Sequence, residues 1–252
     1  MRRVLAFTGA TLRQHARDLP TLAAAIGSPL LLTAFHRLLH GAEGFARWVP
    51  ALVVFALLQL VFASALQVAR ERAQGTAQRL RMTRLTAAEF LVSLALAELA
   101  VSTVAVALTW GLAASFGFES FAGWSTIGVL CGLTGLAHAA MGLAVGAVSS
   151  SATRAFILAS FMMFVLLLFS GLVFPMPTIS WFQVDGQPWG PLDVLPTRHA
   201  MLSLSRVLNG ESLSDVLENV IALAVLSAVW CLLGVGAFHR WVWRRSSVDG
   251  VP

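Results

Sequence analysis

The sequence contains no lysine and no tyrosine, and only 12% of its 252 residues are charged. Soluble globular domains carry about 25% charged residues, so this composition is atypical of one. The absence of lysine excludes a phosphate-binding loop of the type GxxxxGK[ST]. It also excludes catalysis through a lysine Schiff base. Two classes of lysine-dependent chemistry are therefore closed to this chain.

Cysteine is scarce as well. The two cysteines, Cys131 and Cys231, both fall inside apolar runs. A free thiol in such surroundings behaves as a small hydrophobic side chain. We therefore expect neither a disulfide nor a metal-binding role for them.

Apolar sequence is what the chain has in abundance, with 58% hydrophobic residues and a mean hydropathy of +0.79. Several runs reach the roughly 18 to 20 apolar residues that cross a bilayer core about 30 Å thick. We predict an all-α integral membrane protein that forms a single transmembrane domain over residues 1–252. Its six predicted spans are residues 19–39, 49–69, 88–116, 124–148, 155–173 and 220–238.

Two segments outside these spans also favour helices at the membrane surface. Residues 1–18 place Leu5, Leu12 and Ala16 on one helical side and arginines elsewhere, which is typical of an interfacial helix. Residues 174–215 are too long for a simple turn. Their alternation of apolar and polar residues over 197–208 predicts a short amphipathic helix that lies on or enters the interface.

The arginines predict the orientation. Six spans place both termini on one side of the membrane. If that side is the cytoplasm, thirteen arginines are cytoplasmic and four lie outside: Arg37, Arg47, Arg198 and Arg206. This excess follows the positive-inside rule, so we expect both termini in the cytoplasm.

The loop at residues 70–84, RERAQGTAQRLRMTR, holds five of the seventeen arginines. Topology explains its charge, but the order of its residues indicates more. Gly75 permits a backbone conformation closed to other residues, and Thr76 can accept the free amide hydrogens of a following helix. The sequence therefore predicts that the second span continues to Glu71, turns at Gly75 and is followed by a short helix around Leu80.

This loop and the span after it, ERAQGTAQRLRMTRLTAAEFLVSLALAE, resemble the permeases of type-2 ATP-binding-cassette (ABC) exporters. The pattern in that family is an acidic-basic pair, GT, leucine, threonine, and then an acidic-aromatic pair, here Glu89 and Phe90. A second resemblance covers SGLVFPMPTIS and LPTRHAMLSLSRVLNG, which match the family's SG, FP, P-T and R-x-x-x-G elements. These matches fall at Ser170, Gly171, Pro175, Pro196, Thr197, Arg206 and Gly210.

The resemblance implies a role for each region. The loop resembles a coupling helix that docks into a groove of a separate ATPase, through Arg70, Glu71, Gly75, Thr76, Arg79, Leu80 and Thr83. The second and fifth spans resemble those that line the substrate path at a dimer interface, here with Gln59, Phe62, Met162, Met163 and Leu166. The segment after the fifth span resembles re-entrant extracellular helices that close the exit, with Gly171, Pro175, Pro196 and Arg206.

The same resemblance implies the function. The chain would be a transport subunit rather than an enzyme, and it would move an amphipathic or hydrophobic substrate out of the cytoplasm. It would act in the bacterial cytoplasmic (inner) membrane as a homodimer, or as a heterodimer with a related permease. Two copies of an ABC ATPase subunit would bind ATP and Mg, so we expect no cofactor in this chain and no nucleic-acid partner.

Some side chains keep other functions open. Glu98 lies about ten residues into the third span, where an ionisable group is a functional hypothesis by default. It indicates either a proton-coupled secondary transporter or a structural acid that is paired or nearer the interface. His138 indicates either an intramembrane enzyme or a hydrogen-bonded helix contact. Glu71 has two candidate partners, an arginine of the ATPase and Arg79.

Two residue spacings indicate a possible metal site and possible positions of close helix packing. His36 and His40 are four residues apart and could present two imidazoles to a metal, but Arg37 beside them and the lack of a nearby third ligand argue against it. Four glycines in the fourth span form two small-xxx-small pairs, which predict close helix packing within the subunit. They are Gly128, Gly132, Gly142 and Gly146.

Overall fold

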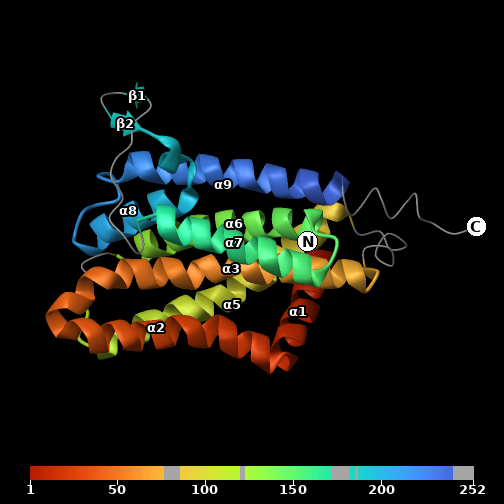
Figure 1. Ribbon diagram of the computed structural model, residues 1–252, viewed down its shortest axis with the longest axis horizontal. Helices are drawn as coiled ribbons and strands as arrows, with labels where there is room; N and C mark the ends of the chain where they lie inside the picture. The colour runs from red at the N-terminus through yellow and green to blue at the C-terminus, as the bar shows by residue number, and fades with distance from the viewer. Residues whose placement is uncertain (77–85, 120–122, 172–181, 185–186, 241–252) are drawn as a thin grey trace, which may run out of the picture.

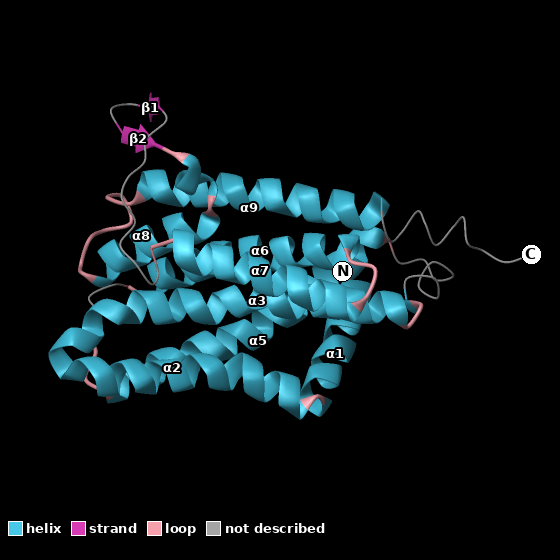
Figure 2. Ribbon diagram, viewed as in Figure 1, coloured by secondary structure: helices cyan, strands magenta, loops and turns pink. Residues whose placement is uncertain are grey.

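The computed structural model describes residues 1–76, 86–119, 123–171, 182–184 and 187–240. Helix dominates these residues, and strand is confined to one short hairpin at an end of the bundle (Figure 2). The α-helices are α1 (Arg2–Arg17), α2 (Leu19–Phe45), α3 (Val49–Ala73), α5 (Ala87–Ser115), α6 (Trp124–Val148), α7 (Ala152–Phe169), α8 (Pro196–Leu208) and α9 (Leu217–Phe238). The shorter elements are the 3-10 turns η1 (Ala46–Trp48) and η2 (Pro191–Val194) and the antiparallel strands β1 (Phe182–Val184) and β2 (Gln187–Trp189), which the sequence does not predict.

Five helical segments in the described residues are long and apolar enough to cross a membrane. They are Leu19–Ala73, Ala87–Ser115, Trp124–Val148, Ala152–Phe169 and Leu217–Phe238. The first has 55 residues, which would extend about 80 Å as one straight helix. It folds back instead, because Gly41 adopts φ 65° and ψ −169° and interrupts the helix. Consequently α2 and α3 run side by side, and the bundle has the all-α architecture of a membrane protein (Figure 1).

Several long helices begin at a side chain that caps them. Thr86 and Glu89 form a capping box at the start of α5, in which the Thr86 hydroxyl accepts from the Glu89 amide at 3.2 Å. The Glu89 carboxylate accepts in return from the Thr86 amide at 2.8 Å. Ser151 caps α7 by accepting from the Arg154 amide at 3.2 Å. These polar residues satisfy amide hydrogens that have no partner within the helix.

The centre of the bundle is α3, which packs against α2, α5, α6, α7 and α8. Two glycines of α6 allow its close approach to α3. A Cβ atom at Gly142 would lie 2.4 Å from the Val61 carbonyl oxygen, and one at Gly146 would lie 2.6 Å from the Ala65 carbonyl oxygen. The predicted glycine packing is therefore correct for this pair.

The other glycine pair of α6 does not pack in this way. A Cβ atom at Gly128 or Gly132 would meet nothing within 4 Å. Both residues line a cavity of about 240 Å³ next to Trp110 and Trp124. The prediction of close packing within the subunit is wrong for this pair, because no backbone of a neighbouring helix comes near it.

Two helices at the periphery bury little of their apolar surface. The described side chains of α7 that are fully buried are Ala155, Ala159 and Leu166, while Phe161 and Phe164 are exposed. In α9 a similarly small share of the side chains is buried. Helices that are apolar on all sides fit a lipid environment, where outward apolar side chains need no protein partner.

The first helix, α1, crosses one end of the bundle and packs on α5 (Figure 1). The Phe7 ring lies 5.2 Å from that of Phe90, and the Thr8 hydroxyl donates to the Ser93 carbonyl at 3.2 Å. The side with Leu5 and Ala16 faces outward. The C-terminal ends of α3 and α9 lie at the same end of the bundle as α1, whereas α8 and the β1–β2 hairpin lie at the opposite end.

Candidate functional site

The predicted coupling loop begins where α3 ends. Gly75 has φ of +67°, which confirms the predicted backbone turn at this residue. Thr76 follows in helical conformation. Arg79, Leu80 and Thr83 lie outside the described residues, so the docking helix stays a prediction.

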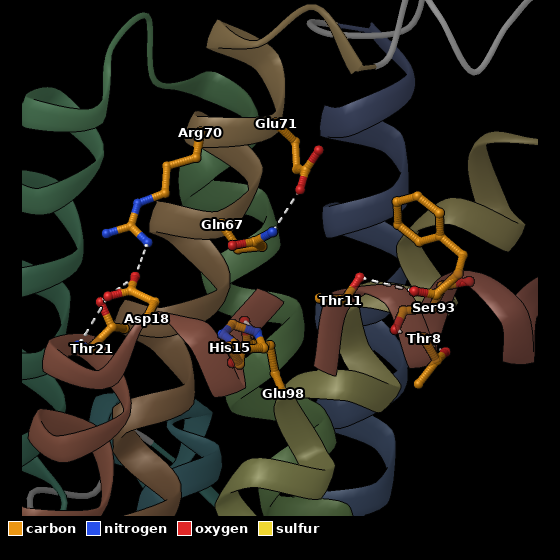
Figure 3. A network of polar contacts seen from close by, with 11 residues as sticks. Thr8, Thr11, His15, Asp18, Thr21, Gln67, Arg70, Glu71, Ser93 and Glu98 are labelled. Atoms are coloured by element: carbon orange, nitrogen blue, oxygen red, sulfur yellow. Dashed lines mark hydrogen bonds and ion pairs between the residues drawn. The ribbon is translucent and has the colours of Figure 1, made fainter. Parts of the chain in front are cut away.

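Two arginines connect the end of α3 to neighbouring helices. The Arg70 guanidinium lies 2.9 Å from the carboxylate of Asp18, at the junction of α1 and α2 (Figure 3). Hydrogen bonds from Thr21 above all, together with Arg70, hold the pKa of Asp18 below its usual value. Arg72 donates to the carbonyl of Ser149, directly after α6, at 2.8 Å. The helix that enters the coupling loop is thus attached on two sides.

Glu71 lies between these arginines in the sequence but points into the protein. Its side chain is 6% exposed and accepts a hydrogen bond of 2.7 Å from the Gln67 amide, one turn earlier on α3. Neither candidate partner from the sequence is observed, because Arg79 lies outside the described residues and no ATPase is present. Gln67 was not among the predicted site residues, although a spacing of four residues on one helix is the signal for such a pair.

The intramembrane acid Glu98 is also paired. Its side chain is 2% exposed, and its Oε1 atom lies 3.0 Å from Nε2 of His15 on α1 (Figure 3). The contact is one of ion-pair distance, and neither atom has a hydrogen-bond partner in the part of the chain that the structure describes. The contact with Glu98 raises the pKa of His15 above 6.5 in spite of its burial. The structure therefore supplies the pairing that was one of the two interpretations of Glu98.

His15 was not among the predicted site residues. It continues the helical side of α1 that packs on α5, four residues after the buried Thr11 and eight after Phe7. That spacing could have indicated His15. Its partner could not be identified from the sequence, because 82 residues separate His15 from Glu98 along the chain.

A cavity of about 460 Å³ lies beside this pair, between α1, α2, α3 and α5. Its polar lining consists of His15, Thr21, Ser28, Gln59, Gln67, Arg70 and Glu98, and the rest is apolar. At one side Gln59 donates to the Ser28 hydroxyl at 3.3 Å. Two predicted path residues, Gln59 and Phe62, line this cavity.

A second cavity, of about 340 Å³, lies between α3 and α7. Gln59, Phe62 and Met163 line it, together with aromatic residues that include Phe156. The rings of Phe62 and Phe156 meet edge to face at 5.1 Å. Three of the five predicted path residues therefore meet at one cavity.

The other two predicted path residues do not line either cavity. Met162 and Leu166 pack instead in an apolar cluster with Leu58 and Met141, where Leu166 is fully buried. Side chains of one helix point in different directions. The prediction that α7 lines the substrate path therefore does not identify which of its residues reach the cavity.

His138 is fully buried in α6, and its Nε2 atom is hydrogen-bonded at 2.8 Å to the hydroxyl of Thr197, in the first turn of α8. The structure thus supports the interpretation of His138 as a helix contact. Among the described residues, no carboxylate is hydrogen-bonded to this imidazole. Thr197 belongs to the P-T element noted in the sequence.

Two of the predicted gate residues, Pro196 and Arg206, belong to α8. Pro196 is the buried first residue of α8, and α8 packs against α3, α6 and α9 at the end of the bundle. Arg206 forms a 2.6 Å ion pair with Glu211, which raises the pKa of its guanidinium. Gly171, with φ of +83°, ends α7. Pro175 lies outside the described residues, and the gating role stays a prediction.

The remaining candidates have ordinary surroundings. The rings of His36 and His40 both pack on that of Trp48. The centroid of the Trp48 ring lies 4.9 Å from that of His36 and 5.2 Å from that of His40. Among the described residues no group of three possible metal ligands occurs. Cys131 and Cys231 are free thiols.

Comparison with models of protein families identifies a match over most of the chain. The model of the family described as ABC-2 family transporter protein matches residues 32–235. The search of curated proteins found no significant match. The matched region extends from within α2 to the last turn of α9 and includes the end of α3 and the whole lining of the 340 Å³ cavity. It does not include α1 or the first part of α2, whose residues form one side of the 460 Å³ cavity.

Proposed function

Because the chain belongs to the ABC-2 family of transporter proteins, we propose that it exports a substrate driven by a separate ATPase subunit. The observation that carries this proposal is the course of α3. Gln59 and Phe62 on this helix line both cavities, and the same helix ends at the turn of Gly75. A force applied at that turn therefore acts on the helix that lines the candidate substrate path.

In this proposal α2, α3, α5, α6, α7 and α9 are six membrane spans, with both termini in the cytoplasm of a bacterial cell. The positions of α1 and of the end of α9, at one end of the bundle, support this orientation (Figure 1). Arg70, Arg72 and Arg154 belong to that end, as the positive-inside rule requires. The segment around α8 would then be extracellular and would act as a re-entrant gate.

The energy source would lie in a partner. A chain without lysine has no Walker phosphate-binding loop, so two ABC ATPase subunits would bind ATP and Mg. The loop at residues 70–84 would dock onto an ATPase subunit. Closure of the ATPase dimer would push on the end of α3. The contacts of Arg70 with Asp18 and of Arg72 with Ser149 would transmit that push to α1 and α2 and to the α6–α7 junction.

The substrate would be amphipathic or hydrophobic. Pockets that bind small molecules are mainly apolar with a few polar groups that set orientation, and both cavities have this character. The exposed apolar side of α7 supports an arrangement in which α7 meets a second permease, either another copy or a related chain.

A proton-coupled secondary transporter is the second candidate. The observation that favours it is the 3.0 Å contact between His15 and Glu98 beside a cavity. It requires transport by the isolated chain under a proton gradient, without ATP. The first proposal requires that no transport occurs without the ATPase.

The decisive experiment first asks whether a neighbouring reading frame encodes an ABC ATPase, and then whether this chain copurifies with that ATPase. The test variant combines Arg79→Glu with Leu80→Asp, and the control is Arg47→Glu at the opposite end of the bundle. We expect the double variant to lose the ATPase and the control to retain it. If the double variant binds the ATPase and couples ATP hydrolysis to transport as the parent chain does, the docking assignment is wrong.

A further inference from the structure

The carboxylate of Glu98 lies at the cavity without a permanent positive charge beside it. It is almost completely buried, and Oε1 lacks any hydrogen-bond partner in the described residues apart from its contact with His15. A buried carboxylate is strongly disfavoured unless a positive group lies against it. The cavity beside Glu98 is therefore a place where a cation is stabilised.

The counterion that the protein provides is removable. His15 carries its charge only while protonated, and an imidazole changes charge within the physiological pH range. It also comes from α1, which packs on the bundle mainly through α5. The positive charge at Glu98 therefore depends on the protonation of His15 and on the packing of α1 against α5.

The other charged groups near the pair are Arg70 and Glu71 on α3 and Asp18 at the α1–α2 junction. Arg70 on α3 lines the cavity but is paired with Asp18 at the α1–α2 junction. Glu71 on α3 does not line the cavity, and its carboxylate accepts a hydrogen bond from Gln67. When His15 is neutral, Glu98 on α5 is therefore the one uncompensated charge among the described groups that face the cavity.

The rest of the cavity suits an apolar body. Leu22 and Ala25 of α2, Phe62 and Leu66 of α3, and Val101 of α5 form much of its wall. Its volume of about 460 Å³ lies within the range of small-molecule sites. A single buried negative charge in an apolar enclosure selects a ligand that is both positively charged and lipophilic.

We infer that this cavity binds a lipophilic organic cation, whose positive centre replaces the imidazole of His15 against the carboxylate of Glu98. The inference rests on the proposed transport function and names the substrate class. Protonated His15 competes with the ligand for Glu98. Affinity therefore rises as the pH increases through the pKa of His15, which the Glu98 contact places above 6.5.

The test uses the full chain in nanodiscs of phosphatidylglycerol, with no ATPase and no ATP. The probe is radiolabelled tetraphenylphosphonium, and tetraphenylborate is an anion of matched shape. Empty nanodiscs give the partitioning into lipid. We expect saturable binding of the phosphonium, tighter at about pH 8.5 than at about pH 6, and no saturable binding of the borate.

Variants assign the binding to the cavity. Glu98→Gln keeps the side-chain shape and should weaken binding by about tenfold or more, as expected for the loss of a charged partner in a buried site. His15→Ala should strengthen binding at the lower pH and remove the pH dependence. Ala25→Phe fills the cavity without changing a charge and should abolish binding. Glu43→Gln, an exposed acid at the far end of α2, should change nothing.

The choline headgroup of a lipid carries an organic cation, as the probe does. A second experiment therefore distinguishes a lipid ligand from a free amphiphilic cation. If phosphatidylcholine added to the nanodiscs displaces the phosphonium, the natural cation is a lipid headgroup; if it does not, the cation is a free amphiphile. Binding that survives both Glu98→Gln and Ala25→Phe, or equal binding of the borate, overturns the inference, as does the absence of saturable binding. Each of these results leaves the docking of the ATPase untouched, because no ATPase is present.

Discussion

The Arg70 guanidinium, at the end of α3, lies 2.9 Å from the carboxylate of Asp18, which caps α2 directly after α1. This contact joins the helix that enters the coupling loop to two helices at the same end of the bundle. Asp18 is at the same time fixed by Thr21, whose hydroxyl donates to it at 2.7 Å. The pair therefore has a defined geometry although both side chains are partly exposed.

Asp18→Asn should reduce the coupling between substrate and ATP hydrolysis more than it reduces the stability of the folded chain. A partly exposed ion pair contributes less than about 1 kcal/mol to folding, so thermal unfolding should change little. Substrate-stimulated ATP hydrolysis should fall by roughly two- to tenfold, the range expected for contacts along a coupling route. The measurement is ATPase activity of the reconstituted complex, with Glu119→Gln as a control at an exposed position. Unchanged stimulation would show that the pair plays no part in coupling.

Gly142→Ala and Gly132→Ala should differ sharply although both change one glycine of α6. The added Cβ at Gly142 would lie 2.4 Å from the Val61 carbonyl oxygen and must push α3 away. We expect a loss of about 1 to 3 kcal/mol in the free energy of unfolding, typical of overpacking. At Gly132 the Cβ has open space, and the substitution should be neutral or slightly stabilising because alanine favours helix. Thermal unfolding in detergent measures both, and equal effects would contradict the observed α3–α6 packing.

The attachment of α1 should depend on pH through His15. The folded-state pKa of His15 is raised, so the stabilisation from its contact with Glu98 is fully present below about 6.5 and is lost as the pH rises through the raised value. Amide hydrogen exchange of α1, corrected for the intrinsic rate, should therefore be faster at alkaline pH. His15→Ala should remove this dependence, whereas His239→Ala should keep it. A pH-independent α1 in the parent chain would refute the prediction.

Thr197→Val should detach the first turn of α8. The substitution keeps the shape of the side chain but removes the hydroxyl that meets His138 at 2.8 Å. A buried imidazole left without its partner costs about 1 to 3 kcal/mol. Ser205→Ala removes an exposed hydroxyl of the same helix and should stay within about 0.5 kcal/mol of the parent. Thermal unfolding combined with hydrogen exchange of α8 tests this, and similar results for both variants would contradict it.

Local features were predictable from short stretches of sequence. Apolar runs predict the long helices because the hydrophobic length of a bilayer is fixed. Gly75 predicts the turn after α3 because a positive φ costs glycine little. The amphipathic alternation over 197–208 predicts the helix that the structure describes as α8. The family, too, was predicted from short motifs, and the match over residues 32–235 confirms it.

Contacts between distant residues were not predictable in the same way. Glu98 was recognised as an unusual group, but His15 as its partner depends on α1 crossing α5. The two glycine pairs of α6 look alike in the sequence, and only the position of α3 separates Gly142 from Gly132.

The sequence by itself determined a lysine-free membrane bundle of the ABC-2 family, with a turn at the end of α3. Those properties depend on composition, on the length of apolar runs and on the backbone freedom of single residues. The tertiary structure alone decided which polar groups meet, where cavities remain and that a buried carboxylate faces one of them. The reason is that helix packing sets the distances between side chains far apart along the chain, and neither periodicity nor composition encodes those distances directly.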